Sequence, residues 1–249
     1  MPGTVTSPPS IIVDQHRTAT DFLSATHSHL RDNERSSNIV FAHALKRLQK
    51  EAGSALTSPR DVEDWLRFPN HRVPDDPCAF WLSVWTLDPT GDTATLDLVL
   101  SCVDWTLGNY PIFIWSPRPE DKTWSVPRIT QLTNRLIECV PPERVFSVFG
   151  MTWLVKTFSE YWTALTGHEV ESQPFYAALL SYCTQSTFID SDSRLPAGHV
   201  IRPATRSDVK SVGQLCKEFG DDSVSFFHRK EGGRAQFSSL NSNFRCSSP

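Results

Sequence analysis

The chain has 249 residues, of which 39% are hydrophobic and 21% are charged, and its formal net charge is -4. This composition is typical of a folded chain and excludes a chain that is disordered for lack of hydrophobic residues. Because the sequence has no dense Lys/Arg run and no apolar stretch long enough to span a bilayer, neither nucleic acid nor membrane is expected as a partner.

The first part of the chain predicts one strand followed by two helices. Residues 1–10 are rich in Pro, Ser and Thr and are expected to be disordered. Ile11 to Val13 predict a short strand, which is followed by a helix from Thr20 through Leu30 and a helix from Ser37 to Gly53. Residues 54–78 predict a polar loop with a short turn.

The middle of the chain predicts strands that alternate with helices. Apolar or alternating runs typical of strands occupy residues 79–87, 95–103, 110–115, 144–149 and 175–184. Helices are predicted over residues 127–139, where Pro127 suits the first turn, and over residues 152–166, where apolar residues share one face. Gly167 predicts the end of the second of these helices.

A second unit is predicted where the composition changes. Residues 189–198 predict a linker. Residues 199–228 predict a strand at His199 to Arg202 and a helix that Thr205 or Ser207 caps. Residues 229–249 show no periodicity and are expected to be a disordered tail.

The order of these elements predicts the fold class α/β (α+β). Residues 11–188 are expected to form one domain, in which helices flank a central mixed sheet. The unit that follows has only one strand and one helix, which cannot bury their own apolar faces. It is therefore expected to pack on the first domain or on a partner, or to remain poorly ordered.

Three segments carry a resemblance to a known family. They are Phe149-Gly150-Met151, Trp162 to Gly167, and His199 to Val209, in which Arg-Pro-Ala-Thr precedes the helix. Together with the element order, these segments resemble two-part proteins of the GNAT (acyl-CoA N-acyltransferase) superfamily. The resemblance implies a degenerate first GNAT unit, followed by the first strand and helix of a second, CoA-binding unit. The activity that it implies is acyl transfer from acyl-CoA to an amine.

The phosphate-binding loop of this family is missing from the first unit. GNAT enzymes hold the CoA pyrophosphate in a Gln/Arg-x-x-Gly-x-Gly/Ala loop at a helix N-terminus, where backbone N–H groups and the helix dipole favour an anion. The corresponding segment, Ser116 to Thr123, contains no glycine, and its prolines remove donors. Glu120 and Asp121 are expected to repel a diphosphate.

A second segment has the spacing of this loop but not its context. Lys230 to Ala235 follows the predicted helix with no strand before it, and Gln236 to Asn243 is too polar for the helix that the site needs. The catalytic and cofactor-binding residues therefore stay unassigned. Acetyl-CoA is expected as a co-substrate only if a complete second unit exists.

The histidines lack the partners that catalysis or metal binding needs. His27 and His29 face different sides of a predicted helix and are expected at the surface. No carboxylate or cysteine stands at ligand spacing from them, so no metal site is expected. His43 is expected to be satisfied or partly exposed, and His168 suits the end of a helix.

The six cysteines are scattered without CxxC spacing, which disfavours a zinc ribbon or a disulfide framework. Cys102, Cys183 and Cys216 have no paired base and are expected in the core. Residues 1–14 lack the features of a secretory signal. A reducing compartment is therefore expected, the cytoplasm first and the nucleus as an alternative.

The sequence supports three hypotheses about function. In the first, the chain is a GNAT acyltransferase by descent that is incomplete or mis-ended, and the acting residues lie beyond position 228. In the second, it is a non-catalytic binding module, a pseudoenzyme, in which a protein partner or a second copy covers residues 199–220. In the third, the first unit binds a small ligand in the crevice where GNAT sheets splay, near Trp115 and Gly150.

Overall fold

The structure is a computed structural model, and it describes residues 10–53, 56–68, 73, 79–105, 108–174, 177–179, 181–188 and 195–223. The chain divides into two compact units, Met1–Leu180 and Ser181–Pro249. Within the described residues, no helix combines the length and the apolar character that crossing a membrane requires.

The described part of the first unit contains strands and helices in alternation. The strands are β1 (Ser10–His16), β2 (Phe80–Leu87), β3 (Ala94–Cys102), β4 (Asp104–Trp105), β5 (Gly108–Asn109), β6 (Ile112–Trp115) and β7 (Val148–Gly150). The helices are α1 (Ala19–Asp32), α2 (Glu34–Glu51), α3 (Pro59–Arg67), α4 (Lys122–Cys139), the 3-10 helix η1 (Pro142–Arg144) and α5 (Thr152–Thr166). The described part of the second unit contains the 3-10 helix η2 (Arg206–Asp208) and α6 (Val209–Ser223).

Five strands form one sheet in the order β1-β2-β3-β6-β7. Neighbouring strands pair antiparallel, except β6 and β7, which run parallel because α4 carries the chain back between them. The strands β4 and β5 form a separate hairpin, which the sequence did not predict. The fold class is thus mixed α/β, with a mostly antiparallel sheet.

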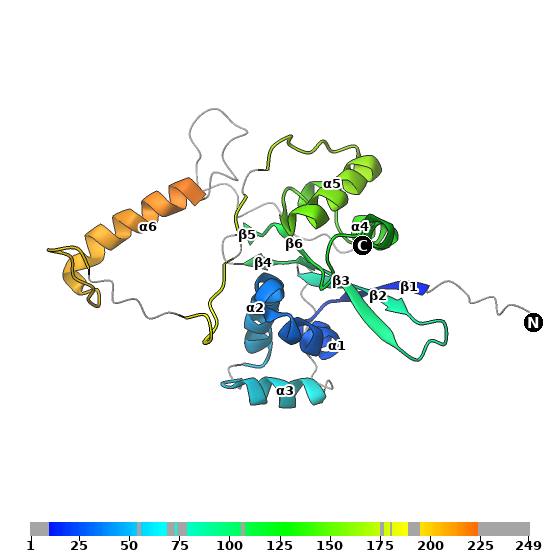
Figure 1. Cartoon of the computed structure of the whole chain (residues 1–249), viewed down its shortest axis with the longest axis horizontal. Coiled ribbons are helices and arrows are strands. Elements are labelled where there is room, and N and C mark those ends of the chain that lie inside the picture. The colour runs from blue at the N-terminus through cyan, green and yellow to red at the C-terminus, as the bar shows by residue number, and fades with distance from the viewer. Residues whose placement is uncertain are drawn as a thin grey trace, which may run out of the picture. The chain divides into compact units, whose positions relative to one another are not determined.

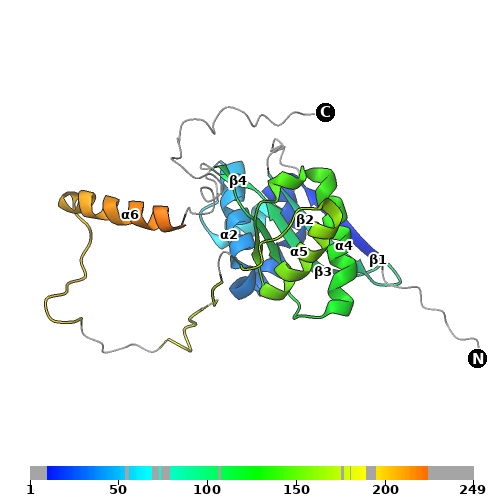
Figure 2. The same cartoon turned by 90° about the horizontal axis from the view of Figure 1, so that it is seen from above.

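Two helical layers cover the two faces of this sheet. Helices α1 and α2 lie on one face, and α4 and α5 lie on the other (Figure 1). In Figure 2, seen from above, α4 and α5 lie in front of the strands of the sheet. Alternate residues of β2 contribute to the two cores: Trp81 and Trp85 belong to the cluster with α1 and α2, and Leu82 and Val84 belong to the cluster with α4 and α5. A strand buried on both faces needs the nearly continuous apolar run that this segment has.

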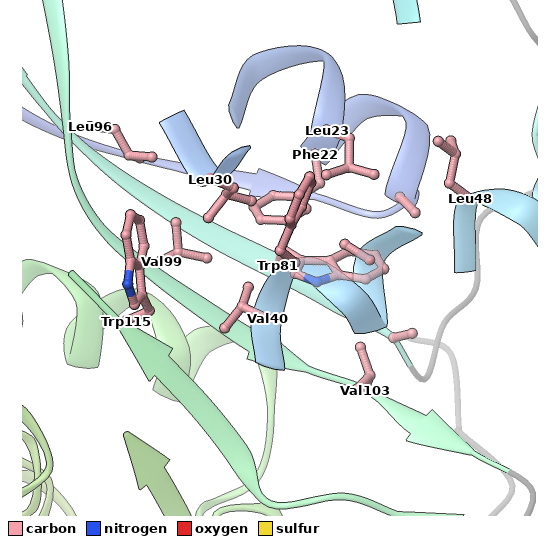
Figure 3. Close-up of a cluster of buried hydrophobic side chains, with 14 of the residues drawn as sticks. Phe22, Leu23, Leu30, Val40, Leu48, Trp81, Leu96, Val99, Val103 and Trp115 are labelled. Carbon is pink, nitrogen blue, oxygen red and sulfur yellow. The ribbon is translucent and has the colours of Figure 1, made fainter. Parts of the chain in front are cut away.

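The core beneath α1 and α2 is built on large side chains (Figure 3). Phe22 of α1 stacks on Trp81 of β2, with ring centroids 5.3 Å apart and an angle of 10° between the ring planes. Leu30 of α1 and Leu48 of α2 are fully buried in the same cluster. Full burial stabilises the fold by about 1.5–3 kcal/mol for a side chain of this kind, so these residues hold the α1–α2 layer on the sheet.

The starts of three helices differ from the predicted ones. Helix α1 begins at Ala19, because the Thr18 hydroxyl accepts a hydrogen bond from the Asp21 backbone N–H at 3.0 Å. Helix α2 begins at Glu34, three residues before the predicted start. Helix α4 begins at Lys122, after an aspartate cap, so Pro127 lies inside the helix and not in its first turn.

Two further helix ends follow local signals. Residues 59–67 form α3 where a loop with a short turn was predicted, because Ser58 and Asp61 complete a capping box and Pro59 occupies the first turn. Helix α5 ends at Gly167 as predicted. This glycine adopts φ 75° and donates its N–H to the Thr163 carbonyl O at 2.8 Å.

Three predicted strands are wholly or partly wrong. The segment predicted over 144–149 contributes only residues 148–149 to a strand, because η1 extends to Arg144. In the segment predicted over 175–184, the described residues form no strand, and Leu179 is 94% exposed. Residues 199–202 likewise form no strand, and Ile201 is 83% exposed. Apolar composition permits a strand, but a strand forms only where a neighbouring edge pairs with it.

Several predictions fall outside the described residues. They are the disordered N-terminus over residues 1–9, residues 189–194 of the linker, and the tail at 229–249 with its loop-like segment. Ser10, which was assigned to the disordered terminus, is the first residue of β1.

Candidate functional site

The loop between β6 and α4 occupies the position at which the family resemblance places a phosphate-binding loop. Asp121 is the N-cap of α4, and its Oδ1 accepts hydrogen bonds from the backbone N–H groups of Thr123 (2.9 Å) and Trp124 (3.2 Å). These N–H groups have no partner within a helix and are the ones that a bound anion uses. In this chain a carboxylate of the same loop already satisfies them.

The charges of this loop also differ from those of an anion site. Glu120 and Asp121 offset Arg118 and Lys122, so the loop carries no net positive charge. The Arg118 guanidinium lies over the Trp124 ring, 5.2 Å from its centroid. The start of α4 is therefore a self-capped helix end, in which the Thr123 and Trp124 N–H groups are already engaged and cations are not in excess.

The strands β6 and β7 stay in close contact where a ligand crevice was hypothesised. Ile114 pairs with Gly150 in the parallel register. A Cβ atom on Gly150 would collide with the Ile114 carbonyl oxygen and lie 2.9 Å from Ile114 Cγ2. Trp115 is buried in the core under α1 and α2, and its Nε1 donates to Ser36 Oγ at 3.1 Å. At this level the two backbones leave no room for one methyl group.

Gly150→Ala tests this close approach. We expect the variant to lose about 1–3 kcal/mol of the free energy of unfolding, as overpacked sites do, because a strand backbone must move to admit the methyl group. Urea unfolding followed by circular dichroism measures the loss. Gly213→Ala is the matched control, because a Cβ at Gly213 meets no atom within 4 Å. A Gly150→Ala variant as stable as the unmodified chain would show that β6 and β7 separate easily.

A buried ion pair joins α4 to the sheet. The register of β2 and β3 shifts between Val84 and Trp85, so that Asp97 is the extra residue of a β-bulge. Asp97 Oδ2 accepts hydrogen bonds from Arg128 Nε at 2.6 Å and from the Thr86 hydroxyl. Asp97 is fully buried and Arg128 is 8% exposed.

The other two guanidinium nitrogens of Arg128 are also engaged. Nη1 donates to the Trp124 carbonyl O at 2.7 Å, and Nη2 donates to the Thr86 hydroxyl. The guanidinium also lies over the Trp124 ring, 4.6 Å from its centroid. Every nitrogen of this arginine thus has a partner within the fold, so it clamps α4 onto β2 and β3. Asp97 Oδ1 has no hydrogen-bond partner among the described protein atoms.

A histidine and a serine meet beneath α1. His16 Nε2 lies 2.7 Å from Ser83 Oγ, and this oxygen accepts a hydrogen bond from Trp85 Nε1 at 2.9 Å. The pairing of a hydroxyl with an imidazole is the arrangement that activates a nucleophilic serine. Ser83 is fully buried, however, so no substrate reaches its oxygen in this structure. The contact therefore connects β1 to β2, and sequence reasoning did not find it because the residues are far apart in the chain.

The predicted positions of the helical histidines are partly wrong. His27 and His29 do face different sides of α1, but neither lies freely at the surface. The His27 ring contacts Phe41 of α2 with centroids 5.5 Å apart, and the His29 ring contacts Trp85 of β2 at 5.6 Å. His43 is partly exposed, as predicted, and stacks on Phe113 at 5.4 Å.

The cysteines also divide between correct and wrong predictions. Cys102 is buried as predicted, and burial raises the pKa of its thiol to about 11. At neutral pH it is therefore protonated and a poor nucleophile. Cys183 and Cys216 are exposed, so their assignment to the core is wrong. Both lie in the second unit, where the side chains of residues 209–218 are exposed.

An open notch of about 580 Å³ lies at the C-terminal end of α2. Its lining comprises Gln49, Lys50, Gly53, Leu56 and Thr57. One cation and a few polar groups do not form a catalytic arrangement. Across the described part of the chain, no group of three or more His, Cys, Asp or Glu residues is placed to hold a metal ion.

No protein-family model, no curated protein and no solved structure matches this chain.

Proposed function

We propose that this chain is a GNAT-like protein whose first unit is a non-catalytic module that does not bind acyl-CoA. The observation that carries the proposal is the self-capped start of α4. Asp121 takes the two N–H groups that the CoA pyrophosphate would need. Acyl transfer needs the acyl group held next to the acceptor amine, and a domain without the phosphate site has no anchor for the donor.

The topology supports the GNAT-like part of this proposal. The sheet order β1-β2-β3-β6-β7, in which only β6 and β7 are parallel, agrees with the expected order as far as α5, whereas the strands expected over 175–184 and 199–202 are not formed by the described residues. In the chain, α4 follows β6 and precedes β7, the place that the resemblance gives to the helix after the phosphate loop. Fold alone does not establish an activity, so the proposal of a non-catalytic unit rests on the chemistry of the loop.

Titration calorimetry of the full chain with acetyl-CoA tests the proposal. We expect no binding at about 1 mM ligand, a concentration that reveals a Kd in the millimolar range. Asp121→Ser keeps a capping side chain but removes the negative charge, and Asp32→Ser removes an exposed carboxylate elsewhere as the matched control. Saturable binding by the unmodified chain that competes with free CoA would overturn the proposal.

A second candidate role concerns α6. Its apolar residues recur at helical spacing, and Val209 and Leu215 are 66% and 65% exposed. A free apolar stripe of this kind marks an interaction surface. We propose that a protein partner or a second copy of the chain covers the 199–220 unit.

The start of this unit is well built in spite of its exposure. Arg202 forms a two-point ion pair with Asp208 at 2.7 and 2.8 Å, and Asp208 also accepts the Thr205 backbone N–H at 2.7 Å. These bonds lower the pKa of Asp208, the ion pair with Arg202 most of all. Light scattering and amide exchange of the isolated chain test the role. A monomer in which the α6 amides are strongly protected would show that the helix needs no partner.

A further inference from the structure

Histidine rings occupy three interfaces of the α1–α2 layer. His16 at the end of β1 contacts Phe22 of α1, with ring centroids 5.7 Å apart. His27 of α1 contacts Phe41 of α2, and His43 of α2 stacks on Phe113 of β6. Histidine rings therefore lie both where this layer meets the sheet and where its two helices meet each other. Each ring can gain a charge by binding a proton.

The opposite layer lacks such groups. The sequences of α4 and α5 contain no histidine. His168 follows the end of α5 and is exposed, 3.9 Å from the Glu143 carboxylate. Among the described histidines, the rings shown to contact the sheet or its covering helices therefore lie on the α1–α2 face.

The contacts of His16 favour its neutral form with Nε2 unprotonated. Trp85 Nε1 donates to Ser83 Oγ, so the one proton of the Ser83 hydroxyl is free to be donated to His16 Nε2. If His16 gains a proton, Nε2 becomes a donor and this hydroxyl proton loses its acceptor inside the core. Burial lowers the pKa of His16, and the nearby carboxylates Asp14 and Asp21 oppose this effect only in part.

The other two rings respond in the same direction. Burial lowers the pKa of His27, Arg31 lowers it further, and Glu63 of α3 opposes the change. Burial and then Lys46 lower the pKa of His43. His29, also in α1, contacts Trp85 of β2 on the same face of the sheet.

The sign of the effect on stability follows from these directions. The folded chain holds protons on His16, His27 and His43 less tightly than the unfolded chain, in which the histidine pKa is about 6.5. Below that value the unfolded state binds more protons, so the free energy of unfolding decreases as the pH falls. For each unit by which a folded pKa lies below the unfolded value, opening becomes up to about tenfold more favourable at low pH.

We propose that the α1–α2 layer is an acid-sensitive element, which loosens from the sheet between about pH 7 and about pH 5 while the α4–α5 layer stays packed. The bistable element is the helix pair, and the histidine rings at its three interfaces are the sensors. This inference does not depend on the proposed function, because it concerns only contacts inside the first unit.

Hydrogen exchange of the full chain, read by mass spectrometry at about pH 7, 6 and 5 and corrected for intrinsic rates, tests the proposal. We expect the protection of the α1 and α2 amides to fall by about tenfold or more relative to the α4 and α5 amides. Equal changes in the two layers, or unchanged protection of α1 and α2 down to about pH 5, would overturn it.

Variants separate the histidines from other titrating groups. A triple variant with His16→Gln, His27→Gln and His43→Gln keeps polar, uncharged side chains and is expected to lose most of the pH dependence. His168→Gln changes an exposed histidine and is expected to keep it. If the triple variant does not fold, the ring-proton titrations of the unmodified chain decide the matter: ordinary or raised pKa values for these rings would overturn the proposal.

Discussion

Replacing Asp97 with alanine is expected to lower the free energy of unfolding by about 3–5 kcal/mol. The carboxylate is fully buried and binds the guanidinium of Arg128 at 2.6 Å. Its removal leaves a buried cation without a counter-ion, and the desolvation of that cation is no longer offset. Urea unfolding followed by far-ultraviolet circular dichroism measures the loss.

A double variant distinguishes the loss of the pair from the loss of packing. In Asp97→Leu with Arg128→Met, both charges are replaced by apolar groups, and the expected loss is within about 1 kcal/mol, because buried pairs replaced together are often neutral. Two results would contradict this role of the ion pair. The double variant could lose as much free energy of unfolding as Asp97→Ala alone, or Asp97→Ala could be as stable as the unmodified chain.

Trp81→Ala is expected to lower the free energy of unfolding by about 3–5 kcal/mol as well. The side chain is 1% exposed and stacks on Phe22, so its removal leaves a cavity beneath α1. The same urea experiment measures the effect. Phe68→Ala is the matched control, because this aromatic ring is 68% exposed and its truncation is expected to change stability by no more than about 0.5 kcal/mol.

Trp81→Phe refines this second result. Trp81 Nε1 is buried and has no hydrogen-bond partner among the described atoms. Phenylalanine removes this unsatisfied donor and keeps most of the apolar area, so a loss well below that of Trp81→Ala is expected. Equal losses for both substitutions would show that a phenyl ring recovers none of the packing of the indole, so that the retained apolar area does not account for the stability of the core.

The apolar periodicity of the sequence predicted the helices and the central strands well. Leu154, Phe158 and Trp162 were expected on one face of a helix, and all three are buried on the α5 side of the core. The apolar run that became β2 is buried on both faces. Burial of one face is a local pattern of period 3.6 or 2, which a sequence displays directly.

Pairing and capping were predicted less well, because each depends on groups outside the local pattern. Residues 175–184 have strand composition, but their described members find no edge to pair with. Asp121 caps α4, so the helix begins at Lys122, five residues before the start that Pro127 had suggested. Apolar periodicity in a sequence shows which face of a helix or strand is buried, but it does not show which other element packs against that face or pairs with that strand.

The polar contacts of the first unit were not predicted at all. Asp97 and Arg128 are 31 residues apart, and His16 and Ser83 are 67 residues apart. Neither pair has a sequence motif, and the bulge that directs Asp97 toward α4 exists only in the paired sheet. The missing glycines of residues 116–123 were visible in the sequence, but the capping by Asp121 needed the structure.

A titration with acetyl-CoA, followed in amide nitrogen–proton correlation spectra of the full chain, shows whether the start of α4 binds the CoA phosphates. We expect the backbone resonances of Thr123 and Trp124 to stay in place up to about 1 mM ligand, because Asp121 occupies their N–H groups. Saturable shifts of these two resonances would contradict it, since they would show that the CoA phosphates displace the carboxylate at the start of α4.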